Sequence, residues 1–517
     1  MKQRKKVVFK EYDKYQLMLP SDLEDLIPEH HIVKVLNEII ERMDIEFLKE
    51  KYPGGGRSSY HPEMMLKVLL YGYTQQIYSS RKLAKALREN VPFMWLSRNN
   101  RPDFRTLNRF RSSIMGLEEL EEIFTELLDL LQEEGYIKLE NYFVDGTKIE
   151  GNANKYTFVW KKSTKKYKAM LREKVKALLI KIEEENVKEN DEYGDKDLEE
   201  LGGEEGISSE KIKSKVEEIE KRLKDKRDDK KLKKALKVLK DDYLPRMEKY
   251  ENQEKLCGDR NSYSKTDPDA TFMRMKEDHM KNGQLKAGYN VQIGTENQFI
   301  VNYSIHQRAG DTSCFISHCE ELKEKLGRLP ENIIADSGYG SEENYDYLEK
   351  NNIGTYVKYN NFHLEQKKKF KEDRFRVENL YYDSNLDEYI CPGLRRLTFI
   401  KECKKKTENG YNTTRRIYEC KSCAGCSLKA CCTKAAGNRK IQISFKLNEY
   451  KAKARSNLLS EIGVKLRGKR AIEPETVFGR LKWNWSFKRF LLRGLEKVKI
   501  EWGLLSIAHN IVKLATI

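Results

Sequence analysis

The sequence predicts a mixed α/β protein, in which a sheet core follows an all-α N-terminal domain and is interrupted by two insertions. Two short apolar segments, Tyr142–Val144 and Ile333–Ala335, each lead to an aspartate that a glycine soon follows. This pattern is typical of buried strands that end in a turn. A segment rich in lysine and glutamate separates the two, and a cluster of cysteines follows the second.

These changes in composition divide the chain of 517 residues into four parts. A chain of this length can form several units of ordinary domain size. The sheet core would combine three separate segments, and the insertions would fill the gaps between them. The predicted boundaries are 1–135 for the helical domain, 136–160 with 262–360 and 466–517 for the core, 161–261 for a helical insertion and 361–465 for a Cys-rich insertion that contains β-structure.

The N-terminal part is expected to be helical because its apolar residues recur at helical spacing. Two short basic segments, Ser79–Leu87 and Arg101–Arg111, are separated by a turn and have the composition of a helix-turn-helix. An ordinary solvated helix face is the alternative interpretation of the second segment. The residues predicted to contact DNA there are Arg105, Asn108, Arg109 and Arg111.

The first insertion is predicted to be a long helical hairpin with a coiled-coil seam. Four apolar residues, Ile212, Val216, Ile219 and Leu223, are spaced by four, three and four positions. The segment 193–209 has the glycine and aspartate content of a turn between the two helices. Such an insertion is more typical of a packing or dimerisation arm than of a chemical site.

The core is expected to contain a β-hairpin, formed by Tyr289–Ile293 and Phe299–Ile305 around a polar turn. Together with the strand that leads into Asp145, it would give three antiparallel strands. A crossover helix and a parallel strand would follow, and then one more strand. These three elements are expected at 312–326, 332–336 and 353–358. His306 and Asp311 would lie near the end of this sheet, either supporting the site or without a catalytic role.

Seven of the ten cysteines lie between Cys391 and Cys432. In a reducing compartment such a cluster indicates metal ligands before it indicates disulfides. Four thiolates would suit a tetrahedral Zn²⁺ ion, and free buried thiols are the competing interpretation. The predicted ligands are Cys391, Cys423, Cys426 and Cys432, with Cys420 and Cys431 as alternatives.

The formal net charge of +17 implies a polyanionic partner, most commonly a nucleic acid. No apolar stretch approaches the ~18 residues of a membrane span, and the N-terminus lacks the apolar segment of a signal peptide. We therefore expect a cytoplasmic, nucleoid-associated protein without membrane contact. Near the C-terminus, basic and aromatic residues are mixed, and we expect a helix whose aromatic face packs in the core while its basic face contacts DNA. The residues predicted to contact DNA there are Arg480, Lys482, Arg489 and Arg493.

Two strand-end aspartates, Asp145 and Asp336, are joined by Glu475 in a basic helical segment. Hard divalent cations take oxygen ligands, and two such ions can hold both the attacking and the leaving oxygen of a phosphodiester. A single strand-end aspartate is more often a turn former or a helix cap, so the sequence around the acids decides between the two.

Six ordered segments resemble the DDE transposases of bacterial insertion sequences, and they extend over almost the whole chain. The matching segments are YHPEMMLKVLLYGY (60–73), SSRKLAKAL (79–87), RPDFRTLNRFR (101–111), VDGTKIEGNANKYTFVWKKS (144–163), IIADSGYGSEENY (333–345) and ETVFGRLKWNWSFKRFLLRG (475–494). The resemblance implies a ribonuclease H-like core with Asp145, Asp336 and Glu475 as a catalytic triad that binds Mg²⁺ or Mn²⁺.

The spacing around the third acid both follows and departs from that family. Lys482 comes after Glu475 with six residues between them, as the resemblance requires. Arg470, however, lies five positions before Glu475 and three before Glu473, which leaves Glu473 as an alternative third acid.

The resemblance implies an enzyme that binds double-stranded DNA at the terminal inverted repeats of its own element. It would cleave a phosphodiester to expose a 3′-hydroxyl and join that hydroxyl to target DNA, acting as a homodimer or a larger assembly. The alternatives are an inactive, element-derived DNA-binding protein that acts as a repressor, and a plain metal-dependent nuclease.

Overall fold

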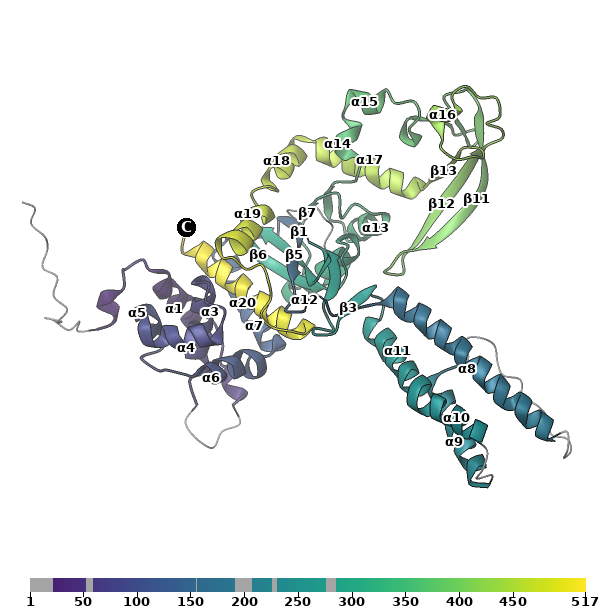
Figure 1. Ribbon diagram of the computed structural model, residues 1–517. Helices are drawn as coiled ribbons and strands as arrows, with labels where there is room; N and C mark the ends of the chain where they lie inside the picture. The colour runs from purple at the N-terminus through teal and green to yellow at the C-terminus, as the bar shows by residue number, and fades with distance from the viewer. Residues whose placement is uncertain (1–21, 53–58, 155, 191–206, 226–229, 276–284) are drawn as a thin grey trace, which may run out of the picture.

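The computed structural model places a β-sheet at the centre, with the N-terminal helices on one side and two long projections on the other (Figure 1). The turn expected at 193–209 lies mostly outside the described residues. No described helix is long and apolar enough to cross a membrane. The structure describes residues 22–52, 59–154, 156–190, 207–225, 230–275 and 285–517.

The central sheet is mixed, with the strand order β4-β5-β1-β7-β8 and with β6 also paired to β5. Strand β1 runs antiparallel to β5 and parallel to β7, and β5 runs antiparallel to β6. These pairings confirm the predicted hairpin, the three antiparallel strands and the parallel strand beside the first. The strands are β1 (Asn141–Glu150), β4 (Thr271–Arg274), β5 (Leu285–Glu296), β6 (Phe299–His306), β7 (Asn332–Ala335) and β8 (Gly354–Val357).

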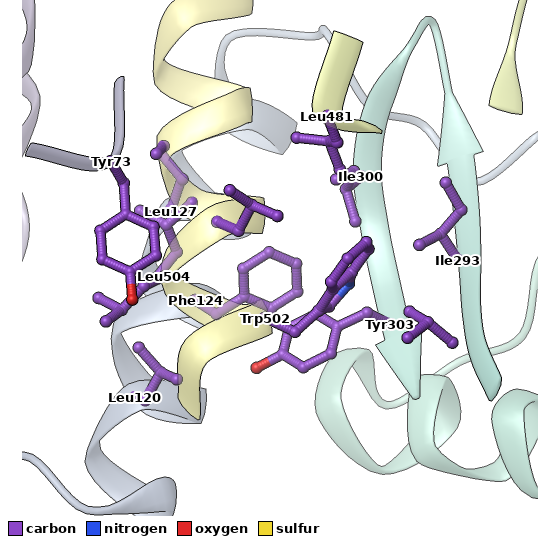
Figure 2. Packing of buried hydrophobic residues seen from close by; sticks show 14 of the residues in the cluster. Tyr73, Leu120, Phe124, Leu127, Ile293, Ile300, Tyr303, Leu481, Trp502 and Leu504 are labelled. Atoms are coloured by element: carbon purple, nitrogen blue, oxygen red, sulfur yellow. The ribbon is translucent and has the colours of Figure 1, made fainter. Parts of the chain in front are cut away.

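The C-terminal helix α20 (Leu495–Leu514) lies between the sheet and the N-terminal helices. Figure 2 shows Trp502 of α20 beside Tyr303 of β6 and Phe124 of α7 (Leu117–Glu133). Each such side chain contributes roughly 1.5–3 kcal/mol by leaving water. The apolar C-terminal helix is thus a packing element, as the sequence predicts. The sheet's other helices include α12 (Phe315–Leu326), the predicted crossover, and α13 (Glu342–Lys350).

The described N-terminal residues are mainly helical, as predicted. The two basic segments form α4 and α6, but a third helix, α5, lies where only a turn was expected. Asn90 explains it, because its side chain accepts a hydrogen bond from the backbone N–H of Phe93 and Pro92 follows in the first turn. The elements are η1 (Glu24–Leu26), α1 (Ile32–Arg42), α2 (Phe47–Glu50), α3 (Pro62–Thr74), α4 (Ser80–Glu89), α5 (Val91–Leu96), α6 (Phe104–Arg109) and the π-helical turn η2 (Phe110–Ile114).

The helical arm, residues 161–257, has an apolar core of its own. Leu171 and Val175 of the outgoing helix pack in one cluster with Ile212, Val216 and Ile219, three residues of the predicted seam. Helix α9 runs antiparallel to the last helices of the arm, since Lys213 pairs with Glu248 and Glu220 with Lys240. The arm therefore has a third limb, and the simple two-helix hairpin is wrong in this respect. The arm contains α8 (Lys161–Asn190), α9 (Ser209–Asp225), α10 (Lys230–Val238), η4 (Leu239–Tyr243) and α11 (Leu244–Cys257).

The Cys-rich lobe, residues 362–443, contains an antiparallel sheet with the order β13-β12-β11-β10-β9 and a separate apolar cluster around Leu397 and Tyr418. The predicted β-structure of this insertion is confirmed. Its helices are α14 (Phe362–Glu365), α15 (Lys368–Lys371), η6 (Val377–Asn379) and α16 (Lys429–Cys432), and its strands are β9 (Tyr381–Asp383), β10 (Glu388–Ile390), β11 (Arg396–Lys406), β12 (Asn412–Cys420) and β13 (Lys440–Ile443).

The chain returns from this lobe to the sheet through α17 (Phe445–Leu459) and α18 (Glu461–Lys469). Helix α19 (Pro474–Gly479) and the π-helical turn η7 (Arg480–Asn484) then lie against the central sheet, ahead of α20.

Candidate active site

The parallel pairing of β1 with β7 brings two aspartates together. Val144 is in register with Ala335, and the next residue on each chain is Asp145 or Asp336. The carboxylates therefore leave the same edge of the sheet on adjacent strands. The side chain of Asp145 is 10% exposed, whereas that of Asp336 is 40% exposed. Regular strands fix both positions firmly.

A glycine close to each aspartate is required by the crowding of this edge. A Cβ atom at Gly146 would lie 2.2 Å from Nε2 of Gln292 and 2.9 Å from Oδ1 of Asp311. At Gly338 it would lie 3.0 Å from Oδ1 of Asp336. The backbone N–H of Gly338 donates to that same oxygen at 2.8 Å. The glycines thus leave room for the carboxylates and for the side chains that hold them.

Arg470 joins both aspartates to Glu475. Its Nη2 lies 3.2 Å from Oδ1 of Asp145 and 3.5 Å from Oδ2 of Asp336, and its Nη1 lies 3.4 Å from Oε1 of Glu475. The arginine is 12% exposed, and Glu475, in the first turn of α19, is 55% exposed. Three acids that are far apart in the sequence therefore share one cation. We call Asp145, Asp336, Glu475 and Arg470 the carboxylate pocket.

Glu473 lies outside this pocket. Its carboxylate is buried and accepts a hydrogen bond from the backbone N–H of Gln298, at the tip of the β5–β6 hairpin, at 2.7 Å. Burial raises the pKa of Glu473. The structure thus brings Glu475, and not the alternative Glu473, to the two aspartates.

A polar network beneath the pocket is centred on Asp311, which the sequence placed near this end of the sheet, and its other members were not predicted. Asn290 and Gln292 of β5 donate to Oδ1 of Asp311 at 2.8 and 3.0 Å, and the hydroxyl of Tyr339 donates to Gln292. Burial, followed by the charges of Asp311, Asp145 and Asp336, raises the pKa of Tyr339. The sequence did carry a signal, because Asn290 and Gln292 are polar residues that alternate with apolar ones within the run Tyr289–Ile293.

Basic side chains adjoin the acids on the side of β8 and α18. Burial, followed by the nearby charges of Arg470 and Arg467, lowers the pKa of Lys358, while Asp336 and Glu475 act in the opposite direction. Arg467 stacks on the ring of Phe362 at 5.2 Å. The mouth of the pocket thus combines carboxylates for a cation with positive charges for a phosphate.

The oxygen donors of the pocket suit a hard divalent cation. Within the ranges that the structure describes, no group of three or more Asp, Glu, His or Cys side chains is spaced to hold a metal ion. The three carboxylates are spaced more widely than metal ligands because the Arg470 guanidinium lies among them and contacts all three. The acids are thus gathered around a cation, which is the property a metal site needs.

Of the DNA-contacting residues predicted in the N-terminal part, three are exposed and one is not. Arg105, Asn108 and Arg109 lie on the exposed side of α6. Arg111 is buried, and its guanidinium donates to the carbonyl of Tyr78 at 3.0 Å and to Asn108 at 3.2 Å. The expectation that Arg111 lies on a DNA-binding surface is therefore wrong, because the π-helical turn points it inward.

The basic residues predicted to contact DNA near the C-terminus also fall into a buried group and an exposed group. Lys482 is buried and donates to the hydroxyl of Thr147 at 2.9 Å, two residues beyond Asp145, so its predicted place on a surface is wrong. Arg480 is partly buried, which lowers its pKa. Arg489 and Arg493 are exposed, but they also donate to carbonyls of the chain after β1, those of Gly151 and Asn152. This segment therefore both supports β1 and leaves positive charge outside.

Cys391 and Cys426, two of the cysteines predicted to bind zinc, lie near each other, but among the described residues no three cysteines are spaced to hold a metal ion. A Cβ on Gly393 would lie 3.4 Å from Sγ of Cys426 and 3.7 Å from Sγ of Cys391. Burial, followed by interactions with Cys423, raises the pKa of Cys420. The sulfur of Cys432 instead accepts a hydrogen bond from the Arg439 guanidinium at 2.7 Å.

Two family models match the chain. The model described as "Transposase domain (DUF772)" matches residues 21–113, and the model described as "Transposase DDE domain" matches residues 390–515. The second range includes Arg470 and Glu475 and ends at the residue that follows α20. Searches of curated proteins and of solved structures returned no match.

Proposed function

The chain carries an N-terminal transposase domain and a transposase DDE domain, and from this premise we propose that it is a catalytically active DDE transposase that cleaves and joins DNA. The observation that supports activity most directly is the convergence of Asp145, Asp336 and Glu475 on one cation. The order of antiparallel strands, crossover helix and parallel strand supports assigning the central sheet to the ribonuclease H-like class.

In this proposal the three carboxylates hold Mg²⁺ or Mn²⁺. The bound ions would activate water or a 3′-hydroxyl and stabilise the leaving oxygen. Asp145 and Asp336 supply fixed oxygens from adjacent strands, while the more exposed Glu475 can adjust its side chain. Lys358 and Arg467 attract the DNA phosphate to the mouth of the pocket, and Lys482 supports β1 from behind through Thr147.

The proposed partner is double-stranded DNA, first the terminal inverted repeats of the element and then the target. The exposed residues of α6, Arg105, Asn108 and Arg109, are proposed to contact the repeats, and Arg480, Arg489 and Arg493 to contact DNA beside the pocket. A net charge of +17 supports such binding. We also propose a homodimer on paired ends, with the helical arm as the element that joins the two copies.

The test uses substitutions that remove charge and preserve shape. Asp145→Asn, Asp336→Asn and Glu475→Gln should each reduce cleavage of end DNA to background while end binding stays intact. Glu473→Gln is the matched control, since it lies two residues from Glu475, outside the pocket, and should cleave normally. If an Asn variant cuts at the wild-type rate, or if Glu473→Gln is the inactive one, the assignment fails.

The same assay separates the two alternative functions. An inactive DNA-binding repressor would bind end DNA without cutting it in Mg²⁺. A plain nuclease would cut but would not join the exposed 3′-hydroxyl to target DNA. Joined products that depend on the divalent ion are the result expected of a transposase.

We further propose that Cys391, Cys423, Cys426 and Cys432 bind a structural Zn²⁺ ion. Backbone N–H groups point at two of these sulfurs, from Arg395 to Cys391 at 3.3 Å and from Arg439 to Cys423 at 3.4 Å. Such bonds stabilise thiolates, the form that binds zinc.

Elemental analysis of the purified full chain tests this second proposal. It should find about one zinc ion per chain, in line with a single four-thiolate site. Cys423→Ser should lose the ion, whereas Cys403→Ser, on β11, should keep it. A zinc-free wild-type protein would rule out the site.

A further inference from the structure

The guanidinium of Arg470 lies where the three carboxylates would otherwise meet a metal ion. We propose that Arg470 is a positioning residue that holds the triad together before metal binding and that leaves the carboxylates when the divalent cation enters. This inference rests on the proposed function, because it concerns the same pocket. It adds an exchange of one cation for another to the assembly of the site.

Three nearby carboxylates repel one another, and each disfavours ionisation of the others unless a positive charge lies among them. Arg470 provides that charge through contacts of 3.2, 3.5 and 3.4 Å. Arg470 is only 12% exposed, whereas Glu475 is 55% exposed. Without Arg470, the side chain of Glu475 would lose its ion pair and would turn toward solvent.

Arg470 and a metal ion compete for the same oxygens. A Mg²⁺ ion needs its carboxylate oxygens at about 2.0–2.1 Å. Here the oxygens that face the pocket, one from each acid, are already directed at the guanidinium nitrogens. Two cations cannot share these oxygens at close range without strong mutual repulsion. Metal entry therefore requires the guanidinium to move.

The surroundings of Arg470 restrict where it can go. Arg467 is close enough to Lys358 for its charge to lower the pKa of that lysine. A displaced Arg470 would therefore add a further positive charge to this cluster. An anion must balance that cluster, and the DNA phosphate that the reaction brings is the available one. Phosphate and guanidinium make strong, charge-assisted hydrogen bonds. DNA binding should therefore favour metal binding, and the reverse must also hold.

Mn²⁺ titration of the full chain without DNA, followed by electron paramagnetic resonance, tests the exchange. If Arg470 fills the pocket about nine-tenths of the time, Arg470→Gln should bind Mn²⁺ about tenfold more tightly than the wild type. Arg470→Lys keeps the charge and should stay closer to the wild type. Arg455→Gln on α17 is the control and should change the affinity far less, because Arg455 pairs with Glu365, outside the pocket.

Unchanged or weaker Mn²⁺ binding by Arg470→Gln would overturn the exchange. The Asp145→Asn variant separates this failure from failure of the proposed function. If Asp145→Asn binds Mn²⁺ as the wild type does, the acids are not the metal site and the proposed function itself fails. If Asp145→Asn loses the ion but Arg470→Gln gains nothing, only the inference about Arg470 fails.

Thermal unfolding gives a second readout that does not depend on activity. Without metal, Arg470→Gln should unfold at a lower temperature than the wild type, because its carboxylates repel one another. Added Mn²⁺ should raise the unfolding temperature of Arg470→Gln more than that of the wild type. Equal shifts in the two proteins would contradict the exchange, whereas a larger shift in the variant supports it.

Discussion

The carboxylate pocket and the Cys-rich lobe were both predicted to bind metal, and they differ in how their candidate ligands come together. The pocket collects acids from β1, the end of β7 and α19 around one guanidinium. In the lobe, residues that are near in sequence come close in space, but Arg439 lies on the sulfur of Cys432. Convergence of distant residues is the stronger evidence for a site, because proximity in sequence brings side chains together even without a function.

A pair of glycine substitutions gives the largest expected contrast between the two regions. Gly146→Ala should reduce cleavage to background and destabilise the protein by about 1–3 kcal/mol, because its Cβ would collide with Gln292 and Asp311. Gly437→Ala in the lobe, where nothing lies within 4 Å of the added Cβ, should leave both properties close to wild type. DNA cleavage and urea unfolding measure the two effects. Equal effects at the two positions would remove the contrast.

Titration of a buried acid in the core should give the next largest effect. Glu501 of α20 accepts hydrogen bonds from the backbone N–H groups of Leu491 and Leu492, and burial raises its pKa to about 7. Its contribution to stability is complete below its unfolded pKa near 4.5 and is lost as the pH rises through about 7. Relative to Glu501→Gln, the wild type should lose about 3 kcal/mol between pH 4.5 and pH 8.

Thermal unfolding of both proteins across that pH range measures the difference. The variant is the necessary reference, because burial lowers the pKa of His306 to about 4 and that of His509 to about 3. These histidines stabilise the fold as the pH rises toward 6.5, which is the opposite slope, and they do so in both proteins. Parallel stability curves for wild type and variant would contradict the role of Glu501.

An acid of the Cys-rich lobe should respond to pH in the opposite direction and more weakly. Burial alone would raise the pKa of Asp387, but hydrogen bonds from Tyr418 and Tyr382 and the charge of Arg416 lower it. Its contribution is therefore present above its unfolded pKa and lost as the pH falls through the lower folded value. Asp387→Asn should destabilise the lobe by about 1 kcal/mol at pH 7, seen as faster limited proteolysis there. The difference in stability between Asp387→Asn and the wild type should shrink toward pH 3. A difference that stays constant with pH would contradict the role of Asp387.

The central sheet could be predicted because each strand carries its own local signal. Apolar runs end at Asp145 and Asp336 beside glycines, and the hairpin has a polar turn. Helix α5 was not predicted although Asn90 and Pro92 are ordinary start signals, because so short an interval between two basic helices also fits a turn. The π-helical turn η4 lies just before Pro245, whose missing backbone N–H disturbs a regular helix and which is visible in the sequence.

The acids of the pocket could be named from the sequence, but their partners could not. A basic residue on a helix looks the same whether the helix faces solvent or another element. Arg111 and Lys482 are buried because η2 and η7 turn them toward Tyr78 and Thr147, contacts that only the tertiary fold creates. The position of Arg470 among three acids depends likewise on how α18 and α19 approach the sheet. The identity of the metal-binding acids remains a prediction for the cleavage assay.

The short strands β2 (Phe158–Trp160) and β3 (Ser262–Ser264) pair with each other at the base of the helical arm. Trp160 is in register with Ser262, so the chain departs and comes back at one point. The apolar cluster of the arm is formed by residues of the arm, so it is separate from the core that contains β1. The arm can therefore be shortened, or replaced by a compact loop that joins β2 to β3, while the strand that bears Asp145 keeps its place.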